Sequence, residues 1–229
     1  MDPSVGRKDL LKKYKERGFN GKYADRHAMV EAMDESVGRV RKSLEAKGIA
    51  DNTVIIVLSD QGGAYSNAPL RGGKKGGDTL AEGGARVPFM IYYPGVTKPN
   101  SVCHTPVQSI DVFPKLVEIV KAEVPNKTDG ISIVPELLGG KQKKHDFLYC
   151  ETQEGRSVKG FRQATRFGKW KAVRYGDNYH TELYKLDNDL FEEHDVSSKN
   201  PKLVAKANEI LKRESVKDEH YPNSGGVFK

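Results

Sequence analysis

Residues 54–63 read VIIVLSDQGG, and this stretch decides the fold of the chain around it. Its first five residues are apolar and mostly β-branched, which predicts a short strand buried on both faces. Ser59 and Asp60 then end the strand. Ligands of open α/β sheets gather beyond the carboxyl ends of the strands, so a carboxylate at Asp60 predicts a hard cation or a basic partner beside it.

The chain on either side continues an α/β pattern up to about residue 140. Residues 23–47 predict an amphipathic helix ended by Gly48. The apolar side chains that recur there at three- and four-residue steps are Met29, Met33, Val37, Val40 and Leu44. A second buried strand is predicted at 87–93 and a further helix at 112–121, with Pro114 in its first turn.

The pattern changes after the basic residues 141–144. Turn-forming residues separate the short strands predicted there, which indicates a small antiparallel sheet; the strands are 147–150, 169–175 and 182–186. Asn200 followed by Pro201 predicts the start of a closing helix. We therefore expect two domains, an α/β domain at 1–140 and a small antiparallel β subdomain with a C-terminal helix and tail at 141–229.

The composition is that of an ordinary globular protein, with 229 residues, 37% hydrophobic and 30% charged. The net charge of +7 is spread widely, which indicates either a solvated surface or a field that attracts an anionic substrate. Basic residues form no stripe with interleaved aromatics, which argues against a nucleic-acid partner. No apolar run reaches the length of a membrane span, and two cysteines allow at most one disulfide.

Two glycine-rich motifs follow the first strand: residues 69–74 read PLRGGK and residues 82–88 read EGGARVP. Together with SDQGG at 59–63 they closely resemble the type I sulfatases, formylglycine-dependent enzymes of the alkaline phosphatase-like superfamily. The corresponding segments of that family read S-D-N-G-G and P-L-R-G-G-K-G-T-x-x-E-G-G-x-R-V-P. The resemblance covers only the second half of the family's chain. It implies a partial alkaline phosphatase-like α/β domain followed by a small antiparallel sheet with a packed C-terminal helix.

The resemblance also implies roles for individual residues. Asp60 matches a ligand of the family's divalent cation, usually Ca²⁺, and Gln61 stands where the family has asparagine or histidine, so it is either a metal ligand or an unliganded loop residue. Lys74 matches the lysine that contacts the sulfate group and offsets charge on the leaving oxygen, a catalytic role. An insertion of about three residues follows, so Lys75 is an alternative sulfate-binding residue. Arg71 matches an arginine of the same loop and is expected to support substrate binding.

Several other polar residues receive plainer interpretations. Glu82 and Arg86 are expected to tie the glycine-rich loop to the strand that follows it. His27, His104 and His145 lack the spacing of metal ligands and are expected on the surface. The paired glycines match no nucleotide-binding motif.

The family's nucleophile has no counterpart in this sequence. It is a formylglycine made from the first residue of a C/S-x-P-S/A-R motif, and neither Cys103 nor Cys150 has that context. By resemblance, the formylglycine and further metal-binding aspartates belong to an N-terminal half, so this chain alone is expected to be inactive.

The expected function is therefore the C-terminal portion of a sulfatase acting on a sulfated carbohydrate or an aryl sulfate ester. A full-length member of the family is expected to be periplasmic, secreted or lysosomal. The alternatives are a phosphoester or phosphonate hydrolase of the same superfamily and a non-catalytic α/β remnant that acts as a binding module.

Overall fold

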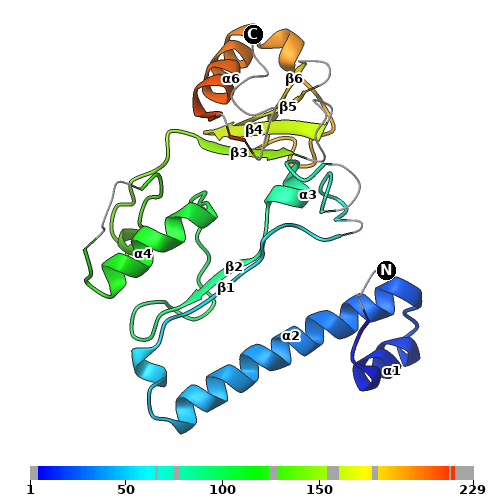
Figure 1. Cartoon of the computed structure of the whole chain (residues 1–229), viewed down its shortest axis with the longest axis vertical. Helices are drawn as coiled ribbons and strands as arrows, with labels where there is room; N and C mark the ends of the chain where they lie inside the picture. The colour runs from blue at the N-terminus through cyan, green and yellow to red at the C-terminus, as the bar shows by residue number, and fades with distance from the viewer. Residues whose placement is uncertain are drawn as a thin grey trace. The chain divides into compact units, whose positions relative to one another are not determined.

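The computed structural model describes residues 5–64, 67–74, 78–123, 128–153, 160–176, 180–216 and 218–219. Figure 1 shows the course of the chain. Two compact units are present, one formed by Met1–Ile55 with Ile91–Lys98 and the other by Ile56–Met90 with Pro99–Lys229. The division predicted at residue 140 stays a prediction. No helix in the described part of the chain has the length and apolar character needed to cross a membrane.

The described elements follow one another along the chain as α1 (Lys8–Glu16), α2 (Gly21–Ala46), η1 (Ala50–Asn52), β1 (Ile55–Leu58), α3 (Glu82–Ala85), β2 (Phe89–Tyr92), η2 (Ser109–Asp111), α4 (Val112–Ile119), α5 (Val134–Leu137), β3 (Leu148–Gln153), β4 (Phe161–Phe167), β5 (Trp170–Tyr175), β6 (Thr181–Lys185), η4 (Ser197–Lys199) and α6 (Pro201–Glu214).

Helices α1 and α2 pack together in the first unit. α2 confirms the helix predicted at 23–47, and Gly48, with φ +67°, ends it as predicted. Ala24 and Ala28 are the buried residues of α2. Their small side chains leave room for the backbone at Gly6, where an added Cβ would lie only 2.6 Å from the Cβ of Ala28.

An aromatic cluster forms where α1 leads into α2. The ring of His27 stacks on Tyr14 at 5.2 Å between centroids, and the ring of Phe19 lies 4.2 Å from it. The expectation that His27 lies on the surface is therefore wrong, since the imidazole is partly buried between two aromatic rings. Its neighbours lie at irregular sequence separations from it, so no local pattern indicates the contact.

The apolar stripe of α2 lies largely at the surface. Met29, Met33 and Val40 are 43%, 58% and 54% exposed. The three- and four-residue periodicity thus predicted the helix correctly, whereas it did not predict whether another element covers the apolar side.

Strands β1 and β2 pair in a two-stranded sheet and confirm the strands predicted at 54–58 and 87–93. The prediction that β1 is buried on both faces is wrong, because Leu58 is 42% exposed and the rest of the strand is only partly buried. Met90 on β2 is 57% exposed. A sheet of two strands has too few neighbours to bury both of its faces. Helix α4 confirms the helix predicted at 112–121.

A four-stranded antiparallel sheet forms the core of the second unit, in the order β3-β4-β5-β6. Strands β3, β5 and β6 match the three predicted strands. The sequence-based prediction misses β4, whose residues FRQATRF interleave charged and polar side chains with apolar ones. Gly168, with φ +57°, makes the tight turn from β4 into β5.

The two faces of this sheet pack against different parts of the unit. Helix α6 covers one face, as Figure 1 shows, through a cluster of Phe167, Ala172, Leu183, Ala207 and Ile210. On the opposite face, Ala164 and Val173 pack against Leu80 of the glycine-rich segment. The predicted class, an α/β portion followed by a small antiparallel sheet with a packed C-terminal helix, is confirmed.

Helix α6 begins at Pro201, as predicted, with Asn200 in the N-cap position. In the described part of the chain the Asn200 side chain makes no capping bond, however. Its amide donates instead to the carbonyl of Val196, at 2.9 Å, and so holds the preceding turn.

Candidate functional site

Asp60 and Lys74 meet at the end of β1. Lys74 Nζ donates a hydrogen bond to Asp60 Oδ2 at 2.8 Å, so a basic partner lies beside this carboxylate at the end of the strand. The hydrogen bond from Lys74 lowers the pKa of Asp60 below its ordinary value. Both side chains remain accessible, at 73% exposure for Asp60 and 47% for Lys74, so both charges are open to a ligand.

The paired glycines of the loop allow two backbone segments to approach closely. Gly62 N–H donates to the Gly84 carbonyl at 2.8 Å, and Gly83 N–H donates to the Arg71 carbonyl at 2.7 Å. A Cβ on Gly62 would lie 1.8 Å from the Gly83 oxygen, and one on Gly83 would lie 2.5 Å from the Arg71 oxygen. Glycine is required here because its lack of a Cβ lets the segments touch. The Lys74 N–H then donates to Gly63 at 3.0 Å, which fixes the lysine beside Asp60.

Arg71 points from this loop into the antiparallel sheet. Its guanidinium forms ion pairs with Asp78 at 3.2 Å and with Glu182 at 3.1 Å, and it donates to the hydroxyl of Tyr184 at 2.6 Å. Glu192 lies 3.8 Å from Arg71 Nε. These contacts hold the loop on β6. A role for Arg71 in substrate binding stays a prediction, since its described partners are all groups of the protein.

A buried ion cluster anchors the other end of the loop. Lys171 Nζ on β5 lies 2.8 Å from Glu82 Oε1 and 3.0 Å from Glu192 Oε1, and the three side chains are 4%, 6% and 0% exposed. Glu192 also accepts the backbone N–H of Glu82 at 2.7 Å. Glu82 was expected to bind the strand that follows it, but its closest partner is Lys171, with Arg86 at 3.7 Å. The sequence analysis missed Lys171 and Glu192, because they lie 89 and 110 residues from Glu82 and no local motif links them to it.

A pocket of about 590 Å³ adjoins the loop. Its lining includes Asp60 and Gln61, a segment around His104, and side chains from β3 and β4 such as Arg166. His104 is exposed, as expected. Asp60 and Gln61, the predicted metal ligands, thus line a ligand-sized pocket. Lys75 lies outside the described residues, so the choice between Lys74 and Lys75 as the sulfate-binding residue stays open.

His145 is not a surface histidine, contrary to expectation. Its Nε2 lies 2.8 Å from Asp111 Oδ1, and the side chains are 14% and 1% exposed. Asp111 also accepts the backbone N–H groups of Gln108 and Ile131, each at 2.8 Å. The pair holds the segment before the antiparallel sheet onto η2. Sequence spacing could not reveal it because Asp111, in η2, and His145, before β3, are 34 residues apart.

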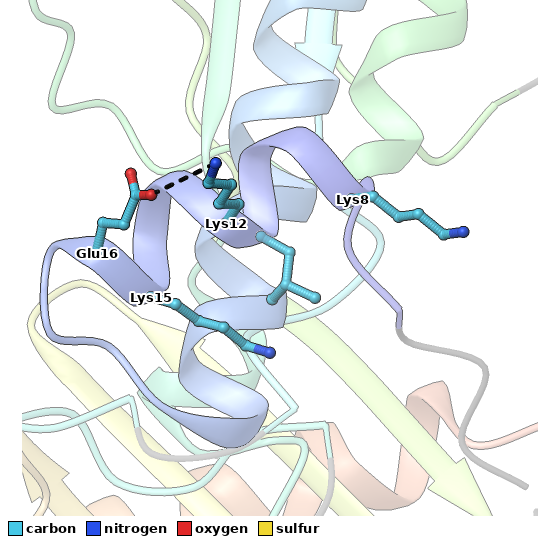
Figure 2. A pocket seen from close by; sticks show the side chains of 5 residues that line it. Lys8, Lys12, Lys15 and Glu16 are labelled. Carbon is cyan, nitrogen blue, oxygen red and sulfur yellow. Dashed lines mark ion pairs between the residues drawn. The ribbon is translucent and has the colours of Figure 1, made fainter.

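Two other clusters of polar side chains lie outside this pocket. Asp189, Glu193 and His194 could bring three ligand atoms within 4.8 Å of one another. Asp189, however, accepts the backbone N–H groups of the other two at 3.0 Å each, which accounts for the cluster as a turn. A shallow hollow of about 540 Å³ lies on α1, and Figure 2 shows its lysines pointing apart, with one ion pair between Lys12 and Glu16 at 3.9 Å. An ion pair as exposed as this one contributes little to the stability of the fold.

The side-chain oxygens of Asp60 and Gln61 could form part of the coordination shell of a hard cation. Ca²⁺ takes about six to eight oxygens, and Asp60 and Gln61 offer a carboxylate and an amide. The other described carboxylates that line the pocket are held elsewhere: Glu82 by Lys171, and Glu151 by the hydroxyls of Tyr149 and Ser215. The remaining oxygens of a complete shell would have to come from other groups.

Two family models together match most of the chain. The family model for Sulfatase matches residues 6–122, and the model for N-sulphoglucosamine sulphohydrolase, C-terminal, matches residues 78–217. The chain therefore belongs to the sulfatase family, whose members generally bind a divalent metal.

Individual relatives agree with this assignment. A protein named sulfatase from Formosa agariphila is 37% identical over 85% of this chain and 40% of its own length, and the steryl-sulfatase of Rattus norvegicus is 33% identical over 71% of this chain and 30% of its own. The crystal structure of Ps i-CgsB in complex with k-i-k-neocarrahexaose superposes with a TM-score of 0.80 at 26% identity, over 92% of this chain and 47% of that one. The chain thus spans less than half the length of these relatives.

Proposed function

We propose that this chain supplies the sulfate-binding lysine and part of the metal site of a sulfatase that hydrolyses sulfate esters of a carbohydrate. The observation that carries the proposal is the 2.8 Å contact between Lys74 and Asp60 beside a ligand-sized pocket. Family membership supports the reaction. The complex of Ps i-CgsB with neocarrahexaose, together with the match to the N-sulphoglucosamine sulphohydrolase C-terminal model, supports a carbohydrate as the substrate.

Lys74 is the residue proposed to act on the reacting group. Its ammonium is compact, half-exposed and held in place by Asp60, so it can donate to a sulfate oxygen without a large rearrangement. A positive charge fixed at this point stabilises the negative charge that develops on the leaving oxygen as the ester bond breaks. Lys75 remains the alternative for this role.

Asp60 and Gln61 would hold the divalent cation, which we take to be Ca²⁺ by family resemblance. When bound, the ion supplies positive charge against the sulfate oxygens. Asp60 suits this role because it is an accessible carboxylate, which is ionised at neutral pH. The nucleophile, a formylglycine, is proposed to lie in an N-terminal half and not in this chain, so the chain by itself should not turn over a sulfate ester.

Calorimetric titration with CaCl₂ tests the metal site without any need for activity. We expect weak binding that Asp60→Asn abolishes, because few oxygens are available. Lys74→Met should strengthen binding, since it removes a cation that shares the Asp60 carboxylate. Glu193→Gln is the matched control in the other acidic cluster. Tight binding that survives Asp60→Asn but not Glu193→Gln would move the site to that cluster.

Activity is tested by joining this chain to the remaining part of the Formosa agariphila relative and measuring 4-nitrophenyl sulfate hydrolysis. Lys74→Met should lose at least about a hundredfold in rate, by analogy with the removal of one oxyanion-hole donor. Lys169→Met, an exposed control, should stay within a few fold. A large loss for Lys75→Met alone would transfer the role to Lys75. Equal, small losses for both lysines, or turnover by the chain alone, would contradict the proposal.

A further inference from the structure

One cationic side chain in the pocket has no counter-charge among the residues that the structure describes. Arg166 lies on β4 and lines the pocket that Asp60 also lines. Its Nε atom is buried and has no hydrogen-bond partner within the described part of the chain. Burying a polar N–H without a partner is costly, so the unpaired Nε of this partly buried arginine points to an acceptor that is supplied from outside the described protein.

The other basic groups of the pocket are already neutralised. Lys171 sits between Glu82 and Glu192, and Arg86 lies 3.7 Å from Glu82. Lys171 is also the cross-strand partner of Arg166 in the β4–β5 register. Glu82 and Glu192 both bind Lys171, and neither carboxylate pairs with Arg166 among the described residues.

The nearest acid on the neighbouring strand does not serve Arg166. Arg166 pairs in register with Leu148 of β3, so the two residues project from the same face of the sheet. Glu151 lies three residues further along β3, so its side chain projects from the opposite face of the sheet, although the residue also borders the pocket. Its carboxylate accepts hydrogen bonds from Tyr149 Oη at 2.5 Å and Ser215 Oγ at 2.9 Å.

We propose that Arg166 binds a second anionic group of the substrate, a sulfate or a carboxylate carried by the carbohydrate at a position other than the ester that is cleaved. The planar guanidinium fork presents parallel N–H donors that match two oxygens of such a group. The pocket volume of about 590 Å³ suits a sugar ring that places its reacting sulfate toward Lys74 and a second anion near Arg166. The site would therefore select polyanionic carbohydrates over singly charged ones.

The inference rests on the proposed function for the identity of the substrate, but its test needs no turnover. Binding of three probes to the chain is measured by calorimetry: glucosamine 6-sulfate, glucosamine 2-N,6-O-disulfate, and a 6-sulfated glucosamine linked to glucuronate. We expect the second or third probe to bind at least about tenfold more tightly than the first. Arg166→Met should reduce that preference to within twofold. Arg166→Lys should keep part of the preference, because the lysine retains the positive charge but loses the two parallel N–H donors of the guanidinium.

Controls separate this inference from the sulfate site itself. Arg39→Met, an exposed arginine on α2, should leave all three affinities unchanged. Lys74→Met should weaken the three probes alike, so a failure of the Lys74 assignment leaves the Arg166 preference measurable. A preference for the disulfate assigns the group as sulfate, and one for the glucuronate probe assigns it as carboxylate. Equal affinities for all probes in the unaltered chain, or a preference that survives both Arg166 variants, would overturn the proposal.

Discussion

The substitution Lys171→Met should destabilise the second unit strongly. It removes the ammonium that lies 2.8 Å from Glu82 and 3.0 Å from Glu192, and leaves two carboxylates that are 6% and 0% exposed. Removing one partner of a buried ion pair costs about 3–5 kcal/mol in free energy of unfolding. Arg71 Nε, 3.8 Å from Glu192, remains as partial compensation, so we expect a loss near the lower end, about 3 kcal/mol.

The loss should depend on pH in a defined direction. Burial raises the pKa of Glu192 above the ordinary value of 4.5 even in the presence of Lys171, and losing Lys171 raises it further. A carboxyl group whose pKa is raised in the folded state binds its proton more tightly there than in the unfolded state, so stability falls as the pH rises from 4.5 through the raised pKa. The destabilisation by Lys171→Met should therefore be larger at about pH 8 than at about pH 4.5.

Urea unfolding followed by the fluorescence of Trp170, the single tryptophan, measures both effects. The matched control is Lys169→Met, which removes an exposed lysine from the adjoining turn and should change the free energy of unfolding by less than about 0.5 kcal/mol. Adding Glu192→Gln to Lys171→Met should recover part of the loss. A loss below about 1 kcal/mol at high pH, or an equal loss at both pH values, would refute the reasoning.

Three further outcomes follow from the structure. Gly83→Ala should cost at least about 2 kcal/mol in urea unfolding, because its Cβ would lie 2.5 Å from a backbone carbonyl oxygen, whereas Gly38→Ala, in an open helical position, should stabilise by about 0.5–1 kcal/mol. Lys115 is fully buried without a hydrogen-bond partner in the described chain, and burial lowers its pKa to about 8. Lys115→Met should therefore raise the free energy of unfolding by about 1–3 kcal/mol at neutral pH. This gain should shrink as the pH rises from 8 through the ordinary lysine pKa of 10.5. Lys74→Met should raise the pKa of Asp60 toward 3.8 in a carboxyl NMR titration, and an unchanged value would mean that the two groups do not interact in solution.

Part of the candidate site was predictable from sequence because it is local. Asp60, Gln61 and Lys74 stand at fixed offsets from the end of a predicted strand, and the paired glycines between and after them mark segments that must approach closely. Family motifs then supplied the chemistry. The supports of the site were not predictable: Arg71 reaches Glu182 and Lys171 reaches Glu82 across long stretches of chain, and no periodicity links such pairs.

The sequence by itself determined where most elements lie, that an α/β portion precedes a small antiparallel sheet, and which glycine-rich loop carries a carboxylate and a lysine. These features follow from the periodicity of apolar residues and from turn-forming residues, both of which can be recognised within windows of about a dozen residues. Only the tertiary structure decided which apolar faces are covered and that β4 completes the sheet. It also decided that Arg166 lines the pocket with no counter-charge in the described part of the chain, while Lys171 opposite it has two. Burial and charge pairing are properties of residues brought together from distant positions, so they follow from the fold and not from any one segment.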